Sequence, residues 1–370
     1  MKKNSNNKIA ASIFLLASSV VSCQMNKQDI GEKRLPNELL CEMTQFIPIE
    51  EKYSIAKLGC ANSVTKYFLE KKLYKHYENL FNTFDKFEKK HARFLLTFYN
   101  NPILRSAAVK ALKENRTITT INLFGFNRVF MDATFILKTL AEVLKENKTI
   151  TTINLAENAI GYTAVEALAE ALKVNKTITT INLAENAIGY TAVEALAEAL
   201  KVNKTITTIY LTGNDIGDAG IETLAEALKV NKTITTIYLT GNAIGDAGIE
   251  ALAEALKVNR TITSIELTGN AIGDAGVAAL AEALKVNKTI TTIALAYSAI
   301  RDAGATALAE ALKVNKTITN IKLIYNGITY SGARMLAEAV RNNTAITIEI
   351  IEYNEGNYTN YTIRGGRFYT

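Results

Sequence analysis

Cysteine and histidine are scarce in this chain, and tryptophan is absent: the 370 residues contain three cysteines, two histidines and no tryptophan. The cysteines, Cys23, Cys41 and Cys60, have no C-x-x-C spacing, so the sequence contains no zinc or redox motif of that kind. The histidines, His76 and His91, lie in an aromatic segment without an evident nucleophile or metal partner. We therefore expect no metal, no cofactor and no catalytic centre.

Other motifs for chemistry are also missing. The recurring Gly-Asp-Ala-Gly lacks the Lys-Ser/Thr that completes a phosphate-binding loop. Pairs of glutamates four residues apart, such as Glu166 and Glu170, recur in most of the expected helices, which is typical of a solvated face and not of an acid/base pair. We predict a protein that is not an enzyme and acts through its surfaces.

Positive charge is confined to the first third of the chain. Residues 1–114 contain 19 Lys and Arg against 11 Asp and Glu, whereas the remainder contains 23 against 25. The later part is therefore close to neutral, and this argues against a nucleic-acid partner.

A 28-residue unit dominates the sequence from residue 105 to 354. Residues 149–176 and 177–204 are identical, and the motif Asn-Lys/Arg-Thr-Ile-Thr recurs every 28 residues from Asn147 to Asn315. A fixed period of this length is typical of stacked-repeat proteins, in which each unit buries its apolar face against its neighbours.

Each unit has two halves with different periods. Ile181 and Leu183 alternate with polar residues, which predicts a short strand. The following apolar residues have the i, i+3, i+4, i+7 spacing of one helix face. They are Val193, Leu196, Ala197 and Leu200. We expect Asp218 or Asp246 to cap the start of a helix, and the asparagine after each helix, such as Asn203, to form a left-handed C-terminal cap.

This pattern, L-x-x-L-x-L-x-x-N-x-I followed by a helix, resembles the leucine-rich repeats of ribonuclease inhibitor and NOD-like receptors. The resemblance implies an α/β leucine-rich-repeat solenoid or horseshoe, with a parallel sheet on the concave side and helices on the convex side. It also implies a ladder of hydrogen-bonded asparagines, which Ser298 should interrupt and locally weaken. The ladder residues would be Asn158, Asn186, Asn214, Asn242, Asn270 and Asn326. Residues 355–370 would form a tail that covers the last strand.

The N-terminus is typical of an export signal. Three lysines precede an apolar run, Ile9 to Val21, that is too short to span a bilayer comfortably. The run ends in Val-Val-Ser-Cys, which looks like a bacterial lipobox. We predict a signal peptide at residues 1–22, lipidation and membrane attachment at Cys23, and a linker at residues 23–34; an ordinary signal or an uncleaved anchor is the alternative.

Residues 35–75 resemble the F-box, a short all-α module that docks on a Skp-type adaptor of cullin ubiquitin ligases. The tryptophan of that family is replaced by Ser63 here, and Gly59 replaces a valine. The alternative is a helical cap for the first repeat, and residues 76–104 would be a helical connector. The residues that match the F-box and would dock on the adaptor are Leu35, Pro36, Leu39, Leu40, Phe46, Pro48, Leu58 and Cys60.

Exposed strand positions differ between repeats, whereas the core positions hardly change. Tyrosines supply large contact areas at low entropic cost and are suited to protein recognition. We predict a protein-binding patch on the concave sheet; drift on an unused surface is the alternative. The patch consists of Tyr210, Tyr238, Glu266, Tyr297, Lys322 and Tyr325.

The leading functional hypothesis is a substrate adaptor of a host-associated bacterium. An F-box-like module followed by leucine-rich repeats would link a host ubiquitin-ligase adaptor, through residues 35–70, to a target on the concave sheet. That function requires translocation into the host cytoplasm. The alternative is a lipid-anchored bacterial surface protein for adhesion or ligand binding. A third possibility, a GTPase regulator like the Ran activators, lacks a distinctive arginine or asparagine.

Overall fold

The computed structural model describes residues 109–125, 133–354 and 357–369, in which short strands and helices alternate. Residues 109–114 form a helical segment ahead of the first strand. The further elements are β1 (Thr120–Asn122), α7 (Ala133–Leu144), β2 (Thr152–Asn154), α8 (Tyr162–Val174), β3 (Thr180–Asn182), α9 (Gly189–Val202), β4 (Thr208–Tyr210), α10 (Gly217–Val230), β5 (Thr236–Tyr238), α11 (Asp246–Val258), β6 (Ser264–Glu266), α12 (Asp274–Val286), β7 (Thr292–Ala294), α13 (Asp302–Val314), β8 (Asn320–Leu323), α14 (Tyr330–Ala339), β9 (Thr347–Asn354), β10 (Asn357–Arg364) and β11 (Arg367–Tyr369).

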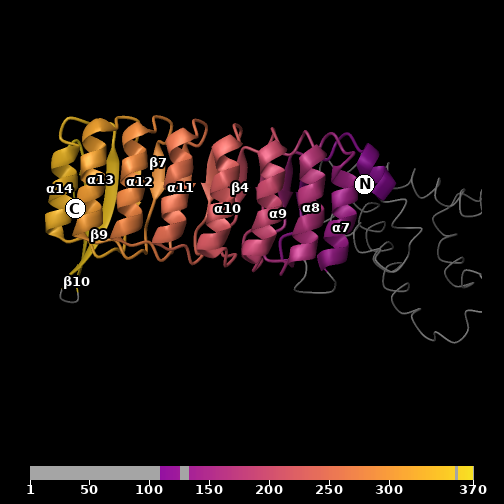
Figure 1. The fold of residues 1–370 in the computed structure, drawn as a ribbon, viewed down its shortest axis with the longest axis horizontal. Coiled ribbons are helices and arrows are strands. Elements are labelled where there is room, and N and C mark those ends of the chain that lie inside the picture. The colour runs from indigo at the N-terminus through magenta and orange to yellow at the C-terminus, as the bar shows by residue number, and fades with distance from the viewer. Residues whose placement is uncertain (1–108, 126–132, 355–356, 370) are drawn as a thin grey trace, which may run out of the picture. The chain divides into compact units, whose positions relative to one another are not determined.

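The strands form one sheet whose order is the chain order, β1 to β11. Neighbouring strands from β1 to β9 are parallel and in register, so that Ile181 lies opposite Ile153 on one side and Ile209 on the other. The helices α7 to α14 lie side by side in one row along the sheet (Figure 1). The predicted leucine-rich-repeat solenoid is therefore confirmed for the described residues.

The core lies between the sheet and the row of helices. Ile181 and Leu183 of one repeat are fully buried, as are Val193 and Leu196 of the helix that follows them. The same positions are buried in the later repeats, since the strand period of two and the helix period of 3.6 direct the same letters inward each time. Every repeat thus contributes one slice to a continuous apolar layer.

The predicted asparagine ladder is present. The Asn186 backbone N–H donates to Oδ1 of Asn214 at 3.1 Å, and the Nδ2 group of Asn186 donates to the Leu155 and Leu183 carbonyls. The same bonds link Asn214 to Asn242. Because these side chains are almost fully buried, the bonds satisfy turn backbone groups that water does not reach.

The ladder is interrupted at Ser298, as the sequence predicts. Asn270 accepts from the Asn242 N–H at 2.9 Å, but Ser298 makes only a 3.5 Å bond from its hydroxyl to the Ala296 carbonyl. The Ala299 N–H donates instead to the Ile272 carbonyl. A serine is too short to bridge two repeats, and the local weakening that we expect from it stays a prediction.

The expectation for the asparagines after the helices is wrong. Asn203 has an extended backbone, with φ −66° and ψ 135°, and not a left-handed one. Its Oδ1 accepts from the N–H groups of Thr205 and Ile206, and its Nδ2 donates to the Leu172 carbonyl in the preceding repeat. These residues form a second buried ladder between the helix ends and the strands, and this bonding favours the extended conformation over a left-handed cap.

The aspartates cap helices, but not the helices to which they belong. The start of α10 receives no side-chain cap, although Asp218 lies in its first turn. Asp218 Oδ1 instead accepts from the N–H groups of Gly245 and Gly248, at 2.7 and 3.0 Å, at the start of α11. A Cβ atom on Gly248 would lie 2.6 Å from that oxygen, so glycine makes room for the approach. Asp246, Asp274 and Asp302 make equivalent contacts with the next repeat.

The C-terminal end of the sheet is antiparallel. Residues 357–364 fold back on β9 as β10, and β11 adds a three-residue edge strand. The rings of Tyr330, Tyr361 and Phe368 gather there, with centroids 5.6–6.4 Å apart. These strands and rings cover the final repeat, where an open stack would expose apolar surface.

Several predicted features lie outside the described residues. They are the signal peptide at 1–22, the lipidation site Cys23, the linker at 23–34, the F-box-like module with its Leu35 to Cys60 docking residues, and the connector at 76–104. They stay predictions.

Candidate binding face of the sheet

The residues between the two buried positions of each strand form a row across the sheet. Tyr210 lies directly opposite Tyr238, and Tyr238 lies opposite Glu266. Ala294 follows, and then Lys322 and Glu349. The identical repeats on the N-terminal side place Asn154 and Asn182 in the same row. The register therefore brings together Tyr210, Tyr238 and Glu266, which the sequence places 28 residues apart.

Tyr210 and Tyr238 stack face to face. Their ring centroids are 4.2 Å apart, and the ring planes differ by 6°. Burial is the largest cause that raises the pKa of Tyr238, followed by the Tyr210 hydroxyl and the Glu266 carboxylate. Because the two rings hold each other upright, they form a rigid apolar ridge on the sheet that needs little further ordering on contact with a partner.

Glu266 stands next to the ridge and is partly shielded from water. Burial raises its pKa, and the ammonium group of Lys322 opposes that shift. Ala294, which lies between them in the row, is fully buried although it belongs to the sheet face. We attribute this burial to the longer flanking side chains. In the row, Lys322 therefore lies between two carboxylates: Glu349 on the next strand, and Glu266 two strands back, beyond Ala294.

Tyr297 and Tyr325 form a second aromatic pair, with centroids 4.5 Å apart. They occupy the turn position just before the ladder residue, with φ of 52° and 56°. Gly213, Gly241 and Gly269 take this left-handed conformation in the middle repeats. A left-handed conformation is unfavourable for a side chain with a Cβ atom, by roughly 1–2 kcal/mol per residue. Two exposed aromatic rings are therefore kept at positions that favour glycine.

One feature of this face was not predicted: the carboxylate of Glu185 extends over Gly213 of the next repeat. A Cβ atom on Gly213 would lie 2.5 Å from Glu185 Cδ and Oε1. In the same repeat, the last residue of β3, Asn182, folds back on the turn that follows, where its Oδ1 accepts from the Ala184 N–H at 2.9 Å. Glu185 and Gly213 occupy the same position of consecutive repeats, and this change from glutamate to glycine was the sequence signal that could have predicted the contact.

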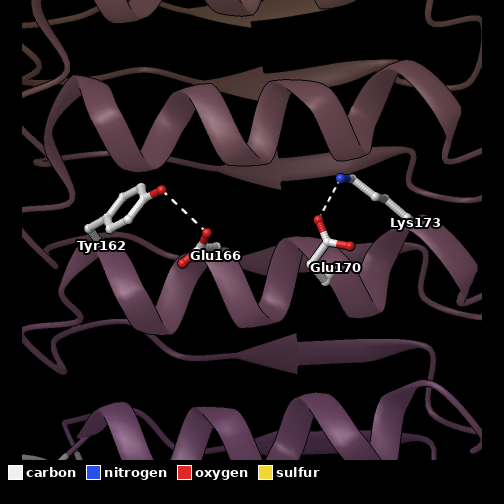
Figure 2. Close-up of polar contacts among 4 residues, drawn as sticks. All are labelled: Tyr162, Glu166, Glu170 and Lys173. Atoms are coloured by element: carbon white, nitrogen blue, oxygen red, sulfur yellow. Dashed lines mark hydrogen bonds and ion pairs between the residues drawn. The ribbon is translucent and has the colours of Figure 1, made fainter.

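The opposite, helical face has a uniform polar pattern. In α8, the Tyr162 hydroxyl donates to Glu166 at 3.4 Å, and Lys173 pairs with Glu170 (Figure 2). The same lysine–glutamate pair recurs in the five helices that follow. Exposed pairs of this kind add little stability. Glu166 and Glu170 thus each contact a separate partner on the exposed helical face, Tyr162 and Lys173.

Within the described residues, no group of three or more histidine, cysteine, aspartate or glutamate side chains is placed to hold a metal ion. Likewise, none of the helices described has the length and apolar character needed to cross a membrane.

Comparisons with known proteins agree with the repeat. A family model described as "Leucine Rich repeat" matches residues 146–169, 174–197, 202–225, 230–253, 258–281 and 286–309. No curated protein matches the chain.

Three solved structures align with parts of the chain, each with a TM-score below 0.5. The leucine-rich-repeat protein LegL7 from Legionella pneumophila is 18% identical over 71% of this chain and 82% of its own, with a TM-score of 0.41. The tropomodulin C-terminal domain of Caenorhabditis elegans is 18% identical over 41% and 92%, with a TM-score of 0.35. Leiomodin-1 actin-binding site 2 is 24% identical over 40% and 86%, with a TM-score of 0.33. With six matched units and the ladder described above, residues 146–309 are leucine-rich repeats.

Proposed function

We propose that the chain is a non-enzymatic protein-interaction scaffold whose sheet face holds a partner protein. The observation that carries this proposal is the pair of aromatic ridges, Tyr210–Tyr238 and Tyr297–Tyr325, on an otherwise polar sheet face. Rigid aromatic side chains lose little entropy on binding and are enriched among the residues that dominate interfaces. Backbone strain kept under exposed tyrosines points the same way, since such strain clusters at functional sites.

The experiment compares proteins captured by the full chain with those captured by the Tyr210→Ala, Tyr238→Ala double variant. A matched control replaces Tyr162 and Tyr190, two exposed tyrosines of the helical face. Proteins retained by the parent and the control but lost by the sheet variant, in quantitative mass spectrometry, support the proposal. Equal recovery by all three chains, with unchanged melting curves, would remove the ridge from consideration.

The finer proposal is that the scaffold is an F-box-like substrate adaptor of a host-associated bacterium. The match of residues 35–60 to the F-box pattern, followed by leucine-rich repeats, supports it. Binding of the full chain to a purified Skp-type adaptor is expected, and Leu39→Ala with Leu40→Ala should abolish it. If no complex forms at high micromolar concentration, the adaptor proposal fails and the scaffold proposal stands.

A lipid-anchored surface protein for adhesion or ligand binding is the second candidate. It rests on the Val-Val-Ser-Cys motif that ends at Cys23. Mass spectrometry of the mature N-terminus decides between the two candidates together with cell fractionation. A diacylated Cys23 in the bacterial membrane favours this candidate, whereas an unlipidated chain in host cytoplasm favours the adaptor.

A further inference from the structure

Acidic side chains gather on the N-terminal part of the sheet face, although the chain has a formal net charge of +6. Across β2 to β6, the residues between the two buried strand positions and those just before the ladder asparagines include three carboxylates and no lysine or arginine. The carboxylates are those of Glu157, Glu185 and Glu266. The basic residues Lys322, Arg364 and Arg367 lie in the later strands β8, β10 and β11. A partner that complements this face is therefore basic, because complementary potentials favour and orient association.

The tyrosine ridge ends next to the identical repeats. Tyr210 stacks on Tyr238 through one ring face, so its other face is directed toward the strand that carries Asn182. The Asn182 amide is folded down onto the Ala184 N–H, and Ala184 is itself small. Beside the outer face of the Tyr210 ring there are thus a folded-back amide and a small side chain.

The carboxylate of Glu185 lies at the same junction between repeats. It lies over Gly213, three residues beyond Tyr210 on the next repeat, and no lysine or arginine of the described part forms an ion pair with it. An aromatic ring face and a carboxylate are the two groups that a guanidinium contacts best, by stacking and by charge-assisted hydrogen bonds. A lysine lacks the planar surface for the first contact.

We infer that the partner of this face is a basic, extended protein segment, and that one of its arginine side chains lies over Asn182, between the Tyr210 ring and the Glu185 carboxylate. This inference rests on the proposed function, because it names the chemistry of the partner that the sheet face would hold.

The test uses a fluorescein-labelled peptide of three arginines alternating with glycines and the full chain, in a fluorescence anisotropy titration at low salt. Matched peptides contain glutamate or lysine in place of arginine. We expect the arginine peptide to bind, the lysine peptide to bind several-fold more weakly and the glutamate peptide not to bind. The affinity should fall steeply between about 50 and 300 mM salt, since exposed charges are screened.

Variants locate the binding. Glu185→Gln and Tyr210→Ala should each weaken binding of the arginine peptide at least fivefold, whereas the control Glu194→Gln, an exposed glutamate of the helical face, should change it less than twofold. Equal binding of the arginine and glutamate peptides, or equal effects of Glu185→Gln and Glu194→Gln, would overturn the inference.

The capture experiment separates this inference from the proposed function. If captured proteins are lost with Tyr210→Ala, Tyr238→Ala but fully retained with Glu185→Gln at high salt, the inference fails and the scaffold function stands. If the arginine peptide binds through Glu185 while capture never depends on the tyrosines, the inference is supported and the proposed function fails.

Discussion

The repeats at 177–204 and 205–232 are built on the same frame but present different surfaces. Both bury the same strand residues, Ile181 and Leu183 in the first and Ile209 and Leu211 in the second, and both place an asparagine in the ladder. On the sheet face, however, Asn182 becomes Tyr210 and Glu185 becomes Gly213. Fold and recognition therefore rely on separate sets of positions, and substitutions should affect one without the other.

Substitution of a buried ladder residue should cause the largest loss of stability. Asn231 accepts from the Thr233 and Ile234 N–H groups and donates to the Leu200 carbonyl. Asn231→Ala leaves these buried groups without partners, and each unsatisfied group costs about 1–3 kcal/mol. We expect a loss of roughly 3 kcal/mol or more in guanidinium unfolding.

Asn182→Ala is the matched control, because this half-buried asparagine on the sheet face makes only a local bond to Ala184. Its effect should stay within about 0.5 kcal/mol, as for most surface substitutions. Similar losses of unfolding free energy for the two variants would show that the buried positions and the sheet-face positions do not have separate roles.

The cap between repeats should have the next largest effect. Asp218→Ala removes the acceptor for Gly245 and Gly248 at the start of α11, and loss of a cap costs about 1 kcal/mol. Hydrogen exchange should rise in the first turn of α11 and not in α10. Glu222→Ala, an exposed residue of α10, is the control, and faster exchange in α10 would contradict the assignment of the cap to its neighbour.

Repairing the ladder should stabilise the protein. Ser298→Asn supplies an acceptor for the turn at Asn270 and a donor for the adjacent carbonyls, and a buried hydrogen bond contributes about 1 kcal/mol. The melting temperature should rise, whereas Ser298→Ala should leave it nearly unchanged. An unchanged or lower melting temperature for the asparagine variant would show that the turn has adapted to the shorter side chain.

A gain in stability of similar or smaller size is expected at Glu185, where a sheet-face side chain occupies a left-handed backbone position. Glu185 has φ 56°, and Glu185→Gly relieves about 1 kcal/mol of backbone strain, less the entropy that glycine gains in the unfolded chain. Glu185→Ala keeps the strain and should bring no gain. Thermal unfolding of both variants measures the difference, and equal melting temperatures would rule out strain at this turn.

The smallest effect concerns pH. Burial raises the pKa of Glu266 above its ordinary value of 4.5, so the folded chain holds that proton while the unfolded chain releases it. As pH rises from 4.5 through the raised pKa, the free energy of unfolding should therefore fall, and it should not recover above it. Glu266→Gln should flatten this part of the stability profile, measured by urea unfolding across acidic pH. Parallel profiles for the parent and the variant would contradict the shift.

Letter spacing within one unit predicted the strand at Ile181 and the helix at Val193, and the resemblance to leucine-rich repeats predicted the ladder with its gap at Ser298. The contact of Asp218 with Gly248 was not predicted, because it connects residues 30 apart in different units. Each of the four capping aspartates is followed by a glycine 30 residues later, and that pairing was the overlooked signal.

The candidate binding face could be predicted only in part from the sequence. The positions of Tyr210 and Tyr238 could be read from the period, since parallel strands in register place equivalent residues side by side. Their stacking and the reach of Glu185 over Gly213 depend on side-chain rotamers that neighbouring repeats select together, and no single unit encodes them.

The ladders and the aspartate caps have a consequence for how such a chain changes length over evolutionary time. These bonds join a residue of one unit to a fixed position of the next unit, so a whole inserted or deleted unit recreates them at the new junction. The two identical copies at 149–204 are what a recent event of this kind would leave. Among the described strands, other unit lengths occur only at the two ends of the row, where Thr120 pairs with Thr152 and Asn320 with Thr347. A partial unit within the regular part would misalign these bonds, and this favours changes of length in steps of 28 residues there.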